Sequence, residues 1–150
     1  MSLYGVYSQV QGPDGNGLLL PSDPALGGHG GNATTTNATP QISTGGFVPE
    51  DLKTTVVWAD VQARVGAVGT APTAVWSARI KGTFIRNGNS VSQVGAGIST
   101  EVESSPTLAR ISASWTIDTS VTPNAIVPVV KGLTATTILW QWKSFAPESL

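Results

Sequence analysis

The chain has 150 residues, a formal net charge of −1 and only 11% charged residues, less than half the share usual in globular domains. Its eight Lys and Arg residues are scattered and supply no basic face for phosphates, so nucleic acid is not an expected partner. Cysteine is absent and histidine occurs once, which excludes disulfides and makes a metal or another cofactor unexpected. No apolar run approaches the roughly 18 residues of a membrane span, and no signal peptide is visible, so no membrane partner is expected.

Residues 1–46 differ in composition from the rest of the chain. They hold ten of the 17 glycines, and Asp14 and Asp23 are their only charged residues. Turn signals rich in Gly and Pro alternate with a few apolar side chains. We predict an extended arm with little regular structure over residues 1–46 and a linker over 47–53, and we favour an arm held on a partner over a flexible tail. The predicted apolar anchors of this arm are Tyr4, Tyr7, Leu18, Leu19 and Leu20.

From residue 54 onward, apolar and polar residues alternate with the period of two that is typical of β-strands. The predicted strands are 55–65, 74–86, 90–94, 97–102, 109–117, 125–130 and 136–145. Pro128 indicates that the strand over 125–130 is an edge or bulged strand. The pattern predicts an all-β fold, a β-sandwich or jelly-roll-like domain over residues 54–150. We expect a fragment that begins at residue 54 to fold without the arm.

The large aromatic residues of this region need burial in a small domain. We predict that they fill the core or a subunit interface; they are Trp76, Phe84, Trp115, Trp140 and Trp142. Trp140 and Trp142 lie two residues apart and therefore share one strand face. An exposed platform for stacking on sugar rings is the alternative for this pair.

Few residues are candidates for catalysis. His29, the single histidine, lies among glycines, where nothing fixes it beside a nucleophile and an acid. Glu101 and Glu103 lie two apart on one predicted strand and could form the acid pair of a glycosidase, but a solvated strand face is the better interpretation. Arg79 and Lys81 are interpreted in the same way, as a solvated face and not an anion site. We predict no catalytic residues and no enzymatic activity.

One pattern is more specific than alternation. Residues 74–88 follow the order Ala-x-Trp-x-x-x-x-x-Gly-x-x-x-Arg-x-Gly, and the later positions of the same pattern are Val94, Gly95, Trp115, Asp118, Gly132, Thr136, Thr137 and Trp140. This run resembles a module of tailed-bacteriophage structural proteins, and the resemblance covers roughly residues 54–145. It implies a trimeric β-sandwich of the kind found in capsid decoration proteins, head fibres and tail fibres.

The resemblance leads to an expected function. We expect a structural virion protein on the outer surface of the capsid, which decorates and cements the shell through its N-terminal arm. Its partners would be the major capsid protein and two further copies of itself in a homotrimer. The alternative is a head-fibre or tail-fibre tip that binds a host receptor or a host-surface glycan.

Overall fold

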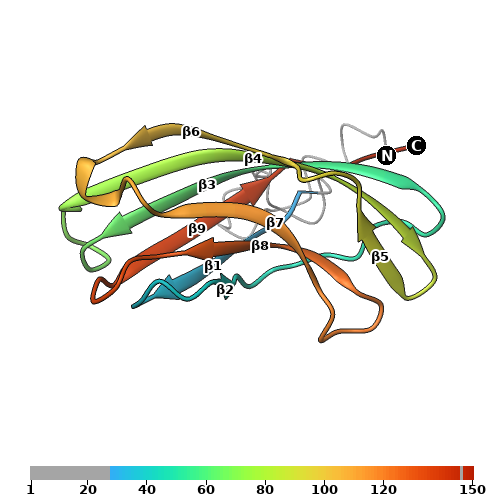
Figure 1. Cartoon of the computed structure of the whole chain (residues 1–150), viewed down its shortest axis with the longest axis horizontal. Coiled ribbons are helices and arrows are strands. Elements are labelled where there is room, and N and C mark those ends of the chain that lie inside the picture. Colours follow the sequence, from blue (N-terminus) through green and yellow to red (C-terminus); the bar gives the residue numbers. More distant parts are fainter. Residues whose placement is uncertain (1–27, 146) are drawn as a thin grey trace, which may run out of the picture.

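The computed structural model describes residues 28–145 and 147–150, which form two β-sheets packed face to face (Figure 1). The large, seven-stranded sheet contains β1 (Gly30–Thr35), β3 (Thr54–Val65), β4 (Ala74–Asn87), β5 (Ser90–Gln93), β6 (Ile98–Ser104), β9 (Ile138–Ser144) and β10 (Glu148–Ser149). The small, three-stranded sheet contains β2 (Gln41–Ile42), β7 (Ser112–Asp118) and β8 (Ala125–Lys131). A three-residue 3-10 turn, Pro106–Leu108, leads from β6 to β7. The predicted all-β fold is confirmed.

All strand pairs are antiparallel, and the large sheet has the order β1-β9-β3-β4-β5. β6 also pairs with β4, beyond β5, and β10 pairs with β3. The small sheet has the order β2-β8-β7. Two neighbouring chain segments, β1 to β2 and β8 to β9, therefore pass together from one sheet to the other. This crossing closes one side of the sandwich.

Alternation along the long strands produces the core. In β3, every second residue from Val57 to Ala63 is buried, and the residues between them face outward. The five large aromatic residues named above are at most 5% exposed; they are Trp76, Phe84, Trp115, Trp140 and Trp142. Trp76 packs edge-to-face against Trp140, and Trp115 packs in the same way against Trp142, the arrangement that aromatic quadrupoles favour.

The prediction that residues 1–46 carry little regular structure differs from the structure over residues 28–46. β1 pairs with β9 along its whole length, and β2 pairs with β8. Glycine permits this close packing, because a Cβ on Gly31 would lie 1.9 Å from the Thr44 carbonyl oxygen. The sequence hides these strands because they are short, polar and at sheet edges, where one face needs no apolar residues. Residues 1–27, which include all five predicted anchors, lie outside the described residues.

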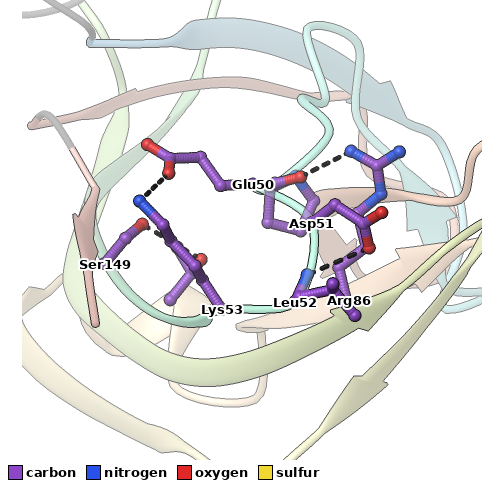
Figure 2. Close-up of polar contacts among 8 residues, drawn as sticks. Glu50, Asp51, Leu52, Lys53, Arg86 and Ser149 are labelled. Carbon is purple, nitrogen blue, oxygen red and sulfur yellow. Dashed lines mark hydrogen bonds and ion pairs between the residues drawn. The ribbon is translucent and has the colours of Figure 1, made fainter.

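Residues 47–53, predicted as a linker, are fastened to the sandwich at both ends. Phe47 is 8% exposed and forms a β-bridge with Ile126. Arg86 donates from Nη1 to the Pro49 carbonyl oxygen at 3.0 Å and accepts at its own carbonyl from the Leu52 N–H. Figure 2 shows the Arg86 guanidinium reaching this segment, with the Glu50–Lys53 ion pair on its other side. This segment is part of the domain and does not act as a hinge between two parts.

Pro128 does not mark an edge or bulged strand, contrary to the prediction, since β8 is the middle strand of the small sheet and its register with β7 shows no shift. The Pro128 carbonyl accepts from the Ser43 N–H at 3.0 Å. The N–H that proline lacks would face the same side of the strand, toward β2. β2 is only two residues long, so the missing donor costs the sheet few hydrogen bonds.

These strands give a prediction about truncation. We revise the expectation from the sequence that a chain beginning at residue 54 folds, because this chain lacks β1, β2 and Phe47. Their loss leaves the β9 edge unpaired and removes the Thr44 carbonyl that accepts from the Trp142 indole. We expect this chain to unfold without a cooperative transition, whereas a chain beginning at Gly28 melts cooperatively like the full chain. Thermal denaturation followed by circular dichroism at 218 nm measures both. A cooperative melt of the shorter chain would contradict the assignment of residues 28–46 to the fold.

Candidate binding face

The outward face of the large sheet carries a straight row of polar side chains. Strand register places Asn32 opposite Gln141, Gln141 opposite Gln62, Gln62 opposite Ser77, and Ser77 opposite Glu103. Side chains that are paired in this way lie about 5 Å apart. The row therefore crosses five strands, β1, β9, β3, β4 and β6, whose residues are widely separated in the sequence.

A charged row runs beside this polar row. Lys143 lies opposite Asp60, and Asp60 lies opposite Arg79. Arg79 binds Asp60 with two hydrogen bonds, Nε to Oδ1 at 2.8 Å and Nη2 to Oδ2 at 3.1 Å. These bonds and the carboxylate charge raise the pKa of the exposed Arg79. Because the pair is exposed to solvent, it contributes little to the free energy of unfolding.

Arg64 holds the loop between β3 and β4 against the other side of the polar row. Its Nη2 donates to the Ala67 carbonyl oxygen at 2.8 Å and to the Thr70 carbonyl oxygen. The loop turns at Gly66 and Gly69, both with positive φ. These hydrogen bonds fix the loop beside the outer face of the sheet.

Between this loop and β1 the face is hollowed into a groove of about 930 Å³. The volume lies within the range of roughly 300–1,000 Å³ that is common for ligand pockets. A second hollow of about 200 Å³ continues from it and is lined by Asp60 and Phe145. Gln62, Gln141 and Lys143 line both hollows. The two hollows therefore form one continuous surface, which we call the outer groove.

Trp76, Trp140 and Trp142 are among the residues that line the outer groove, but they are at most 3% exposed and form no exposed platform. The indole N–H of each of the four buried tryptophans has an acceptor. Trp140 donates to Thr35 Oγ1 at 2.9 Å, and Trp142 donates to the Thr44 carbonyl oxygen at 3.0 Å. Trp115 donates to the Ile80 carbonyl oxygen at 3.4 Å, and Trp76 donates to Glu101 Oε2 at 2.6 Å. The alternative that Trp140 and Trp142 stack on sugars is wrong, because both rings point into the core.

Trp58, the remaining tryptophan, lies on the outer face of the large sheet and is 39% exposed. Lys81 Nζ lies 4.6 Å from the centroid of its ring, within cation–π range. Trp58 is not among the site residues expected from the sequence. Its position among the polar residues of its strand, out of phase with Val57 and Ala59, is the signal that would have found it.

Glu101 and Glu103 do not share a strand face. The register of β6 on β4 shifts between Ser77 and Ala78, so that Glu103 lies opposite Ser77 and Glu101 lies opposite Ala78. Ser77 faces outward and Ala78 is buried, so the bulge turns the two carboxylates to opposite sides of the sheet. The predicted pairing of these carboxylates on one face is therefore wrong.

His29 packs against the sandwich just before β1. Its ring stacks on Phe47, with 4.1 Å between centroids and 5° between planes. Its backbone N–H donates to Ser144 Oγ at 3.1 Å. Partial burial lowers the pKa of His29. Among the described residues, no three His, Cys, Asp or Glu side chains gather closely enough to hold a metal ion, and no helix is long and apolar enough to cross a membrane.

Comparisons with known proteins give little further information. No protein-family model and no curated protein matches the chain. Among solved structures, the chain is similar to the tailspike protein of the Acinetobacter phage vB_ApiP_P1, with 17% sequence identity and a TM-score of 0.30. The similarity covers 79% of this chain and 20% of the tailspike chain. At this identity and TM-score, the similarity assigns no function.

The Trp140 hydrogen bond gives a prediction about stability. Thr35→Val keeps the shape of the side chain but removes the acceptor of a buried indole N–H. We expect it to lower the free energy of unfolding by about 1–3 kcal/mol, the cost of an unsatisfied buried donor. Urea denaturation followed by tryptophan fluorescence measures the change. Thr34→Val, at the exposed neighbouring position, is the control; equal effects of the two variants would argue against the hydrogen bond.

The lowered pKa of His29 gives a prediction about pH. As the pH falls below about 7.5, the unfolded chain takes up a proton at His29 before the folded chain does, so the free energy of unfolding decreases. His29→Phe keeps an aromatic ring stacked on Phe47 but removes the group that takes up the proton. Urea midpoints at about pH 7.5 and about pH 5.5 should differ less in this variant than in the natural chain. Identical differences would remove His29 as the cause.

Proposed function

We propose that the protein is a structural component of a tailed-bacteriophage virion that decorates the outer surface of the capsid. One observation carries the proposal: most residues of the phage-module pattern that the structure describes have structural roles in the sandwich. Trp76, Trp115 and Trp140 are core residues. The glycines and the aspartate of the pattern lie at tight contacts and turns. A pattern built from such residues is typical of a structural module and not of a catalytic site.

Close packing requires glycine at two positions of the pattern. A Cβ on Gly82 would lie 2.7 Å from the Phe84 ring, and a Cβ on Gly132 would lie 2.2 Å from Thr35 Oγ1. Gly88 and Gly95 have positive φ at turns, where other residues are strained. Asp118 accepts two hydrogen bonds from Ser120, one from its N–H at 2.9 Å and one from its hydroxyl at 2.6 Å. These glycines and Asp118 therefore have structural roles at tight contacts and turns.

In this proposal, attachment belongs to residues 1–27. Tyr4, Tyr7, Leu18, Leu19 and Leu20 would contact the major capsid protein, and three copies in a homotrimer would multiply the strength of attachment without any new type of contact. The sandwich itself would stand on the shell and would act without catalysis. The separation of Glu101 from Glu103 by the β6 bulge supports this non-catalytic role.

The alternative is a head-fibre or tail-fibre tip that binds a receptor or glycan. Trp140 and Trp142 cannot provide its binding surface, because both are buried. The outer groove is now the surface on which such binding would occur.

Co-sedimentation tests the attachment. We expect the full chain to pellet with phage heads that lack this protein, and a chain beginning at Gly28 to stay in the supernatant. Replacing Leu18, Leu19 and Leu20 together by Ser should weaken pelleting at least about tenfold in apparent Kd, since three apolar contacts are lost. Circular dichroism verifies that each variant is folded.

Two outcomes would contradict capsid decoration. Pelleting of the chain that begins at Gly28 would remove residues 1–27 as the anchor. Pelleting of the full chain with purified tails and not with heads would favour the fibre-tip alternative.

A further inference from the structure

We propose that the outer groove binds an uncharged oligosaccharide. The groove lies on the outer face of the large sheet, and its floor is built by strands β1, β9 and β3, with β4 beside them. This inference goes beyond capsid decoration and is argued only from groove residues that lie in the described part of the chain, separate from the proposed anchors.

The first argument is the hydrogen-bonding capacity of the groove. Gln62 and Gln141 are paired across adjacent strands, and both side chains are exposed. Within the part of the chain that the structure describes, neither side-chain amide makes a hydrogen bond. An amide offers donors and acceptors at fixed positions on one plane. Neighbouring hydroxyls on a sugar ring also donate and accept, so two adjacent amides match them.

The second argument is the charge balance. Arg64 and Lys143 contribute two positive charges to the groove walls, and Asp60 and Glu103 contribute two negative charges. Their sum is zero, so the groove has no net attraction for a polyanion such as a nucleic acid or an acidic polysaccharide. An uncharged chain of sugars fits this balance, since it needs hydrogen bonds but no counter-charge.

The third argument is the apolar surface at the two ends. Val75, which is 41% exposed, lines one end beside Val68 and Pro72 of the loop that Arg64 holds. Phe145, which is 54% exposed, lines the other end. Sugar rings have apolar C–H faces as well as hydroxyl edges, and exposed apolar side chains at both ends of an amide strip match that alternation. The combined volume of the two hollows favours an oligosaccharide over a single sugar.

The experiment uses the full chain, labelled with ¹⁵N, and the probes cellohexaose, maltohexaose, mannohexaose and, as an acidic comparison, hexagalacturonate. We expect at least one uncharged probe to shift backbone amide resonances concentrated around Gln62 and Gln141. Hexagalacturonate should shift them less. The double variant Gln62→Ala/Gln141→Ala should weaken binding at least about tenfold, since each lost amide removes hydrogen bonds of about 1 kcal/mol.

The matched control is Gln41→Ala, an exposed amide on β2 of the small sheet, outside the groove. This variant should bind like the natural chain. The proposal is overturned if no uncharged probe binds at millimolar concentration, or if the double variant binds as tightly as the control. It is also overturned if a synthetic peptide of residues 1–27 shifts the groove resonances and blocks the sugars, because the groove would then be the docking site of that segment.

Discussion

The contact between the backbones of Gly31 and Thr44 is the constraint on which most of this fold depends. Gly31 belongs to the large sheet, and Thr44 follows the strand that edges the small sheet. The Thr44 N–H donates to the Asn32 carbonyl at 2.8 Å, and the Asn32 N–H donates to Thr44 Oγ1 at 3.0 Å. The Thr44 carbonyl accepts from the Trp142 indole. These hydrogen bonds, one of them between two backbone groups, join the two sheets, so the sandwich is closed on this side and does not rely on apolar packing alone.

The same contact positions the outer groove. Because Gly31 keeps β1 against the Thr44 segment, β1 extends the large sheet beyond β9, and Asn32 joins the row that contains Gln141 and Gln62. A side chain at Gly31 would separate the sheets and move this wall of the groove. The stability of the core and the shape of the face are therefore coupled through a position that has no side chain.

The long strands could be predicted from the sequence because their physics is local. β3 and β4 alternate over many residues, and no buried position except Thr55 carries a polar side chain, so periodicity defines both the strand and its inward face. The burial of the large aromatic residues follows from their size in a small domain. Trp58 is the exception, since its outward position is set by the phase of its strand and not by its hydrophobicity.

The rest depends on contacts between distant segments. β1 and β2 are stabilised by pairing with β9 and β8, which lie far later in the chain. β1 begins with Gly-Gly-Asn, residues that are depleted in strands, and β2 is too short to show alternation. The groove arises from register, because nothing local indicates that Gln62 lies beside Gln141. The β6 bulge is likewise a property of the pairing between β6 and β4, so the sequence of β6 alone does not indicate it. A shift of one residue in this register reverses the sheet face on which Glu101 lies.

The free edge of the large sheet has a consequence for crowding. β5 and β6 follow one another along β4, and no other strand of the described residues pairs with their outer side. Gly95 and Gly97, both with positive φ, break this edge once, and the β6 bulge breaks it again. An interrupted edge offers no continuous row of donors and acceptors to a second sheet. This edge is therefore a poor template for strand addition by a neighbouring copy, even at high local concentration.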